Sequence, residues 1–282
     1  MNGILIADAG STKTDWALLS DSNHEVWQYS GKGLNPVQMS EKDIYDTLLD
    51  VRKSLPPNIN IKFIRYFGAG CATHDINEKL KHIIGSIWPE TEITVSSDLQ
   101  GAAISLFGNN NGIACILGTG SNSCQYIAGE ISQHIPPLGY ILGDEGSATA
   151  LGRRLLTDIF KRTLSNELID EFQFEYHLSL QDLLNNVYKA PRAAQFLSSF
   201  SPFISKNIKN PEIYRLAYEE FELFFRRNVC KYTECHNLSV GFIGSVAVAF
   251  ENIIRTVCID LKLHPGIFIK APVDGLVNYF KR

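Results

Sequence analysis

The sequence lacks the two glycine-rich patterns that most directly indicate a nucleotide site. It contains no G-x-x-x-x-G-K-[ST] segment, so Lys13 belongs to no P-loop. It also has no G-x-G-x-x-G after an apolar stretch, because Gly68-Ala-Gly70 lacks the third glycine. A dinucleotide site of the Rossmann type is therefore unsupported.

Long apolar runs and an excess of positive charge are missing too. The longest weakly polar run, Gly241–Phe250, is about half the length that a membrane-spanning helix needs, so we expect no membrane partner. The 26 basic and 30 acidic residues give a net charge of −4. Binding nucleic acid needs a positive face, so we expect no nucleic-acid partner. A small anionic ligand remains compatible with this charge, because backbone amides bind phosphate.

Cysteine pairs at ligand spacing are scarce. The six cysteines are scattered, mostly in apolar segments where a thiol acts as a small hydrophobic side chain. Only Cys230 and Cys235 lie close together, and their apolar, helical setting favours a structural role over metal ligation. The first residues show no basic, apolar secretion signal, so we expect a cytoplasmic protein with reduced thiols.

The chain does have enough apolar material for about two domains. It has 282 residues, of which 45% are hydrophobic. Apolar alternation and turn residues, including Asp21-Ser-Asn23, predict strands and helices in the order β-β-β-α-β-α-β-α over the first half. The strands are expected at Ile4–Ala7, Thr14–Leu19, Glu25–Tyr29, Lys62–Phe67 and Glu92–Val95, and the helices at Glu41–Leu55, Asn77–Ile87 and Asp98–Phe107.

The opening pattern then recurs. Three short strands are expected again at Ile113–Leu117, Ser123–Ile127 and Ile131–Ile135. Ile6-Ala-Asp8-Ala-Gly10-Ser11 aligns with Ile116-Leu-Gly118-Thr-Gly120-Ser121 at an offset of 110 residues. An offset of that size predicts a duplicated domain, not a solenoid.

The second half differs by a long helical stretch. Helical spacing of apolar residues runs from Gly146 to Tyr232, and Phe221, Phe224 and Phe225 are expected in the core. A strand at Leu238–Ile243 and a helix at Ser245–Leu261 follow. We expect an N-terminal domain at 1–108 and a C-terminal domain at 109–271 with a helical insertion at about 146–233. The last helix, 272–282, is expected to pack back on the first domain.

Three turns carry the residues of chemical interest. Asp8-Ala-Gly10-Ser11-Thr12-Lys13-Thr14-Asp15 joins two strands with a glycine, hydroxyls and amides that suit a phosphate chain. Leu117-Gly118-Thr119-Gly120-Ser121-Asn122 holds the same place in the second half. Gly241-Phe-Ile-Gly244-Ser245-Val-Ala247 joins a strand to a helix, where close backbone approach could admit a nucleoside. Each turn taken alone could equally be a tight structural joint.

Together these turns resemble the phosphate-1, phosphate-2 and adenosine motifs of the sugar kinase, heat-shock protein 70 and actin superfamily. Leu142-Gly143-Asp144-Glu145-Gly146-Ser147-Ala148 is similar to a segment beside the sugar pocket of the N-acetylglucosamine kinase branch, which is grouped with the BadF/BadG/BcrA/BcrD ATPases. Ser97-to-Ala103 and Gly33-Leu34-Asn35-Pro36 match as well. The resemblance implies an α/β fold with two duplicated ribonuclease H-like (actin-like ATPase) domains flanking a nucleotide cleft.

The resemblance also implies roles for individual residues. It implies an ATP-dependent amino-sugar kinase that would phosphorylate the 6-hydroxyl of N-acetylglucosamine or a related hexosamine. Asp98 matches the catalytic base and Asp8 the Mg²⁺ carboxylate. The sugar-binding residues implied are Asn35, Gly139, Asp144 and Gly146. The ATP-binding residues implied are Gly10, Ser11, Thr12, Lys13, Thr14, Gly118, Thr119, Gly120, Ser121, Gly244 and Ser245.

Other interpretations stay open at this point. Asp98 and Asp144 both precede helical stretches, where Asp is a favoured N-cap, and Glu145 suits the first turn of a helix. The BadF/BcrA type of ATPase activator would need cysteines at a dimer contact to hold an iron–sulfur cluster. A filament-forming or sugar-sensing protein is a third option. The helical insertion and the last helix are candidates for a homodimer contact.

Overall fold

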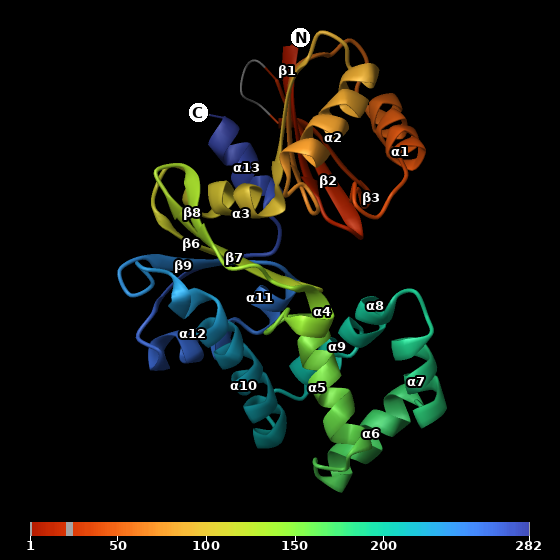
Figure 1. Ribbon diagram of the computed structural model, residues 1–282, viewed down its shortest axis with the longest axis vertical. Helices are drawn as coiled ribbons and strands as arrows, with labels where there is room; N and C mark the ends of the chain where they lie inside the picture. The colour runs from red at the N-terminus through yellow and green to blue at the C-terminus, as the bar shows by residue number, and fades with distance from the viewer. Residues whose placement is uncertain (1, 21–24, 282) are drawn as a thin grey trace. The chain divides into compact units, whose positions relative to one another are not determined.

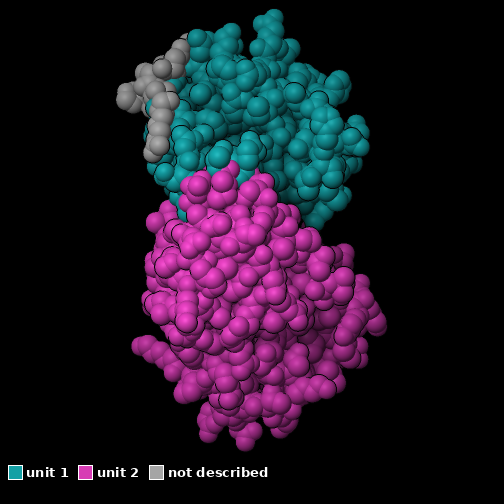
Figure 2. All heavy atoms as spheres, turned by 60° about the vertical axis from the view of Figure 1, so that its left-hand side comes forward, with its two compact units in different colours: residues 1–110, 128–130, 271–282 teal, residues 111–127, 131–270 magenta. Residues whose placement is uncertain are grey.

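The structure is a computed structural model that describes residues 2–20 and 25–281. The chain divides into two compact units, coloured separately in Figure 2. Unit 1 contains residues 1–110, 128–130 and 271–282, and unit 2 contains residues 111–127 and 131–270. The turn expected at Asp21-Ser-Asn23 and the end of the last helix at Arg282 lie outside the described residues. No helix among the described residues is long and apolar enough to cross a bilayer.

Unit 1 is built on a five-stranded mixed sheet of order β3-β2-β1-β4-β5 (Figure 1). β1 pairs antiparallel with β2 and parallel with β4. The strands are β1 (Asn2–Ala9), β2 (Lys13–Ser20), β3 (Glu25–Lys32), β4 (Asn60–Gly68) and β5 (Glu92–Ser97). The helices are α1 (Glu41–Ser54), α2 (His74–Ile87), α3 (Asp98–Phe107) and α13 (Val273–Phe280).

Alternation along β1 and β2 separates two cores. Leu5, Ala7, Trp16 and Leu18 point to the face that packs on α1 and α2. Successive side chains of a strand point to opposite faces, so their neighbours lie on the other face. There Ile6, Ala17, Leu19 and Phe67 pack with Leu276 and Val277 of α13. A Cβ on Gly101 would lie 2.7 Å from Phe67 Cβ, so α3 approaches β4 closely on this second face.

Unit 2 repeats the same sheet topology. Its strand order, from the other edge, is β8-β7-β6-β9-β10, with β6 antiparallel to β7 and parallel to β9. Each strand of unit 2 therefore has a counterpart in unit 1, which confirms the duplicated α/β fold. The strands are β6 (Gly112–Leu117), β7 (Ser121–Ile127), β8 (Glu130–His134), β9 (Ser239–Ile243) and β10 (His264–Ile269).

The helices of unit 2 bury one large aromatic core. Phe221, Phe224 and Phe225 are fully buried, as expected from their spacing. The helices are α4 (Gly139–Leu142), α5 (Ala148–Phe160), α6 (Asn166–Tyr176), α7 (Leu180–Tyr188), α8 (Ala193–Ser198), α9 (Ser201–Lys206), α10 (Pro211–Arg227), the 3-10 turn η1 (Val229–Lys231), α11 (Ser245–Ala249) and α12 (Glu251–Asp260).

One expectation for unit 2 was wrong in detail, and one strand was missed. The helix expected at Ser245–Leu261 is two helices, α11 and α12, with Phe250 between them. No strand was expected at His264–Ile269, where β10 pairs with β9 across a register shift. β10 is the counterpart of β5 in the duplicated topology. It was missed because apolar and polar residues alternate only weakly along it.

Candidate active site

The turn between β1 and β2, Gly10–Thr12, is held by the loop that follows β3. Gly10 N–H closes the turn by donating to Lys13 O over 2.9 Å. Leu34 N–H donates to Gly10 O and Gly33 N–H to Thr12 O, both over 3.1 Å. A Cβ on Gly33 would lie 2.4 Å from Ser11 O, so only glycine allows this approach. The side chains of Ser11 and Thr12 remain exposed.

Asn35 ties the same loop to the turn through its side chain. Asn35 is 7% exposed, and its Nδ2 donates to Ser11 Oγ over 2.8 Å. Its Oδ1 accepts from Val37 N–H over 3.0 Å. A Cβ on Gly70 would lie 2.4 Å from Asn35 Oδ1, so the loop after β4 lies directly against the amide. Tyr66 OH donates to Leu34 O over 3.1 Å and supports the loop from the core.

Three carboxylates gather on the α3 face of the unit 1 sheet. Asp8 of β1 pairs with Asp15 of β2, so both side chains point to that face. Burial, followed by the charges of Asp15 and Asp98, raises the pKa of Asp8 to about 7. Lys13 Nζ lies 2.9 Å from Asp15 Oδ2 and offsets part of the negative charge. One or two carboxylates suit a hydrated Mg²⁺ or a proton transfer. No three acidic side chains of residues 2–20 and 25–281 are arranged to ligate a metal ion directly.

Asp98 begins α3 but does not cap it. The cap is Ser97, whose Oγ accepts from Gln100 N–H over 3.1 Å, so the N-cap interpretation of Asp98 is wrong. Asp98 Oδ1 instead accepts from Leu99 N–H over 2.9 Å. Burial raises the pKa of Asp98, while this backbone bond favours the ionised form and lowers it. The carboxylate is thus partly desolvated and held at a helix N-terminus.

Thr14 does not join these residues. Its side chain is on the opposite face of the sheet from Asp15, is 0% exposed, and its Oγ1 has no hydrogen-bond partner among the described residues. Only the backbone of Thr14 is near the turn, through its pairing with Ala9.

In unit 2 the corresponding turn, Gly118–Gly120, is held by a helix. Gly118 N–H donates to Gly120 O over 2.9 Å. The first residues of α5 then bond the turn: Ala148 N–H donates to Gly118 O over 2.9 Å and Thr149 N–H to Thr119 O over 3.2 Å. Thr149 Oγ1 donates to Thr119 O as well, over 2.6 Å. The side chain of Thr119 stays exposed.

Asp144 lies against this turn with a left-handed backbone. Its φ is 54°, and its Oδ1 accepts from Ser121 N–H over 3.4 Å. Burial raises its pKa, and the Ser121 bond opposes that shift. Ser147, not Asp144, is the N-cap of α5, because Ser147 Oγ accepts from Ala150 N–H over 3.1 Å. The N-cap interpretation of Asp144 is therefore wrong too.

Glu145 also differs from expectation. It precedes α5, is 7% exposed, and places Oε1 2.8 Å from Arg227 Nη1 at the end of α10. It is a buried ion-pair partner and not a charge in the first helical turn. Gly146 has a φ of 70°, and a Cβ there would lie 3.0 Å from Phe224 Cβ. Gly139, with a φ of 72°, has open space around it.

Gly244 and Ser245 adjoin the unit 2 turn. Gly244 has a φ of 125°, and a Cβ there would lie 2.1 Å from Leu117 O, directly before Gly118. Its N–H donates to Ile269 O over 3.0 Å. Ser245 begins α11 with an exposed side chain. The second and third glycine motifs of the sequence thus meet in space.

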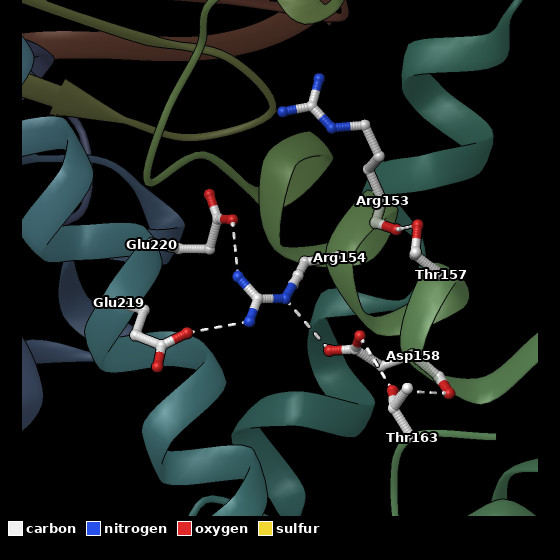
Figure 3. A network of polar contacts seen from close by, with 7 residues as sticks. All are labelled: Arg153, Arg154, Thr157, Asp158, Thr163, Glu219 and Glu220. Carbon is white, nitrogen blue, oxygen red and sulfur yellow. Dashed lines mark hydrogen bonds and ion pairs between the residues drawn. The ribbon is translucent and has the colours of Figure 1, made fainter. Parts of the chain in front are cut away.

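A charged network anchors α5, and with it the turn. Arg154 of α5 bonds Asp158 of the same helix over 3.1 Å and Glu219 of α10 over 2.8 Å (Figure 3). Its Nη1 lies 3.9 Å from Glu220 Oε1. Glu220 is 7% exposed, its Oε2 has no partner among the described residues, and burial raises its pKa. The network joins the two long helices of unit 2.

The cysteines show a structural setting. Cys235 is 5% exposed, and Cys230 is half-buried beside the aromatic core. Burial raises the pKa of Cys230, which disfavours the thiolate that a metal needs. Within residues 2–20 and 25–281 no group of three or more His, Cys, Asp or Glu side chains is arranged to hold a metal ion.

The structure adds residues that the sequence did not single out. Asp15 joins Asp8. Burial, followed by the charge of nearby Asp98, raises the pKa of Cys71 to about 12. A Cβ on Gly143 would lie 1.9 Å from Pro137 O, so that position is restricted to glycine. Strand alternation could have placed Asp15 with Asp8, but no local pattern marks Cys71 or Gly143.

Several solved structures are similar to this chain over nearly its whole length. A candidate N-acetylglucosamine kinase from Porphyromonas gingivalis is 36% identical, with a TM-score of 0.92, over 99% of this chain and 98% of that one. A candidate N-acetylglucosamine kinase from Chromobacterium violaceum is 16% identical, with a TM-score of 0.76 over 98% of both chains. A ROK family glucokinase from Streptomyces griseus, solved with glucose and AMPPNP, is 13% identical with a TM-score of 0.58, over 98% of this chain and 97% of that one.

The last two likenesses show the fold alone, since their identities are low. No protein-family profile and no curated protein sequence matches the chain. The Porphyromonas gingivalis protein is similar enough, over nearly all of both chains, to show that the two proteins belong to one family. The chain therefore belongs to the N-acetylglucosamine kinase and BadF/BadG/BcrA/BcrD ATPase family, within the superfamily of sugar kinases, heat-shock protein 70 and actin.

Proposed function

We propose that the protein is an ATP-dependent kinase that transfers the γ-phosphoryl group of ATP to the 6-hydroxyl of N-acetylglucosamine or a related hexosamine. The observation that carries this proposal is the acidic cluster of unit 1. Asp98 and Asp8 lie near an exposed hairpin turn, and Asn35 bonds that turn. Family membership supports a phosphoryl transfer to a sugar alcohol.

Asp98 is the proposed general base. An alcohol is a very weak acid, so a carboxylate accepts its proton only as the phosphoryl group arrives. Burial makes Asp98 more basic than a solvated carboxylate, and Leu99 N–H fixes its orientation. Protein residues otherwise contribute mainly by positioning the two substrates.

The two turns are the proposed triphosphate sites. Ser11 and Thr12 present exposed hydroxyls in unit 1, as Thr119 does in unit 2, and Lys13 adds a positive charge beside its turn. Phosphate oxygens accept hydrogen bonds from such hydroxyls and from turn amides. Gly244 and Ser245, which adjoin the second turn, are the proposed adenosine contacts.

Asp8 would hold Mg²⁺. A hydrated Mg²⁺ prefers one or two carboxylates with water and phosphate oxygens, and the residues fit that need. Burial, followed by repulsion from Asp15 and Asp98, raises the pKa of Asp8, so a cation there would stabilise its ionised form. When bound, the metal neutralises phosphate charge during transfer. Asn35, Asp144, Gly139 and Gly146 are the proposed sugar contacts.

The test is a panel of sugars with ATP. We expect ADP release to rise with N-acetylglucosamine or a close hexosamine, measured by a coupled assay. The panel includes free hexosamines, N-acylated hexosamines and plain hexoses, each with and without Mg²⁺. ADP release that no sugar stimulates would contradict the proposal.

Changing Asp98 to Asn should lower turnover by about 10²–10⁴-fold, because the general base is lost. Nucleotide binding, measured by calorimetry, should persist. The fold should persist as well, since Ser97 rather than Asp98 caps α3. Near-normal turnover in Asp98→Asn would mean that another carboxylate accepts the proton.

A further inference from the structure

The loop Gly33–Asn35 and the turn Gly10–Thr12 form a short continuous ladder. Each loop residue bonds one turn residue: Gly33 N–H to Thr12 O, Leu34 N–H to Gly10 O and Asn35 Nδ2 to Ser11 Oγ. Two of these bonds are between backbones, and the third joins two side chains. All three are 2.8–3.1 Å long, so the loop holds every residue of the turn.

We propose that Asn35 couples sugar binding to the phosphate turn, so that a sugar hydroxyl held by Asn35 orders Ser11 and the turn for the phosphates of ATP. The inference rests on the proposed function, in which Asn35 contacts the sugar and the turn contacts the triphosphate. Asn35 is then a positioning residue for the nucleotide as well as a sugar contact. The consequence is that the two substrates bind better together than apart.

The chemistry of the amide allows both interactions at once. A carboxamide has two N–H donors and an oxygen with two lone pairs. Ser11 Oγ takes one donor, and Val37 N–H takes one lone pair. One N–H and one lone pair are left for a hydroxyl group of the sugar. A bound sugar would therefore fix the rotamer of Asn35 without breaking its bond to Ser11.

The side chain of Asn35 is held in place by its surroundings, whereas the turn is exposed and can bind a ligand. Asn35 is 7% exposed, and Gly70 lies so near that a Cβ there would be 2.4 Å from Oδ1. Ser11 and Thr12 are exposed, and no hydrogen bond from their N–H groups is found within the described chain. The phosphates can thus accept hydrogen bonds from the N–H groups of Ser11 and Thr12, whose positions depend on the loop Gly33–Asn35.

Coupling between two sites is reciprocal, which defines the measurement. Calorimetry would measure the affinity of AMPPNP with and without the sugar that the kinase panel identifies, and the affinity of the sugar with and without AMPPNP. We expect each ligand to improve the affinity of the other by about five-fold or more in the wild type. Mg²⁺ is kept constant throughout.

Ser11→Ala removes the side-chain bond from an exposed position and keeps the backbone ladder. We expect this variant to lose most of the five-fold enhancement, that is, the ratio of each ligand's affinities with and without the other, whatever its affinity for either ligand alone. Ser11→Thr keeps the hydroxyl and should restore it. Ser86→Ala, at an exposed serine of α2 far along the chain, is the matched control and should behave as the wild type.

The outcomes separate this inference from the proposed function. If no sugar binds and none stimulates ADP release, the proposed function fails and the coupling fails with it. If sugar and AMPPNP both bind but independently in the wild type, the coupling alone is overturned. It is also overturned if Ser11→Ala keeps the full enhancement, or if it weakens AMPPNP equally with and without sugar. That last result would make Ser11 a simple nucleotide contact.

Discussion

The two hairpin turns occupy the same place in duplicated sheets but are supported by different elements. In unit 1 the turn Gly10–Thr12 is bonded by an irregular loop, Gly33–Asn35. In unit 2 the turn Gly118–Gly120 is bonded by the first residues of α5. Ser11 and Ser121, which are 110 residues apart, each bond a proposed sugar contact: Ser11 to Asn35 and Ser121 to Asp144.

The difference indicates which turn can respond to a ligand. α5 is a 13-residue helix whose buried side chains and Arg154 network fix it in the core of unit 2. The loop of unit 1 is buried at Leu34 and supported by Tyr66 OH, but three hydrogen bonds join it to a turn whose Ser11 and Thr12 side chains are exposed. Segments with few buried contacts have the lower local stability. We therefore expect the unit 2 turn to be preformed and the unit 1 turn to be ordered by substrate.

The largest effect expected from this comparison is that of Gly33→Ala. The new Cβ would meet backbone atoms at 2.4 Å from Ser11 O and 2.7 Å from Thr12 C, so the loop must move away from the turn. A shift of about 1 Å at reacting groups costs on the order of 10²-fold, and we expect such a loss in kcat/KM for ATP. Steady-state kinetics with ATP varied at saturating sugar measures it.

Gly85→Ala is the matched control for that change. Gly85 lies inside α2, and a Cβ there would make only an ordinary contact, 3.6 Å from Ile93 Cδ1. Alanine in a helix interior should stabilise unit 1 by about 0.5–1 kcal/mol and leave the kinetics unchanged. Wild-type kinetics in Gly33→Ala would show that the loop does not hold the turn in its active position.

The topology was largely predictable from the sequence, except for strand β10 of unit 2. Alternating apolar residues located β1, β2, β6 and β7, and repetition of the pattern predicted the duplication. β10 was not predicted, because His264-Pro-Gly266 begins it and a register shift interrupts its pairing with β9. Its position becomes evident only when the order of both sheets is known.

At the site, residue types were predictable but their local roles were not. An Asp before a helix is a favoured cap, yet Ser97 and Ser147 cap α3 and α5. The capping residue is the one whose side chain reaches the backbone N–H of the second or third helical residue. A short sequence motif does not determine which side chain that is. The hairpins also show that the 110-residue match is approximate, since Gly10 begins its turn and Gly120 ends its own.

Glu220→Gln tests whether the firm support of the unit 2 turn depends on charge. Burial raises the pKa of Glu220, so its ionised form is disfavoured in the folded state. The wild type then loses stability as the pH rises from the pKa of 4.5 in the unfolded chain through the raised pKa in the folded state. We expect Glu220→Gln to unfold a few degrees higher than the wild type near pH 7.5 and at the same temperature near pH 4.

Thermal unfolding at both pH values measures this difference. Glu219→Gln is the control, because Glu219 is more exposed and makes the 2.8 Å contact with Arg154. It should give no gain in stability at pH 7.5. If Glu220→Gln is less stable than the wild type at that pH, the ionised side chain supports α5 through Arg154 despite its burial.

Thr14→Val should have the smallest effect, and it separates the two threonines of the first motif. Thr14 Oγ1 is buried without a partner among the described residues and points away from Asp15, whereas Thr12 is exposed in the turn. Replacing a buried unpaired hydroxyl by a methyl of similar shape should raise the free energy of unfolding by no more than about 1 kcal/mol. The KM for ATP should stay within about two-fold of the wild type, while Thr12→Val should raise it more. A large rise in KM for Thr14→Val would mean that the unit 1 turn rearranges when ATP binds and turns this hydroxyl toward the phosphates. The rearrangement on substrate binding that we infer for the unit 1 turn would then include the first residues of β2.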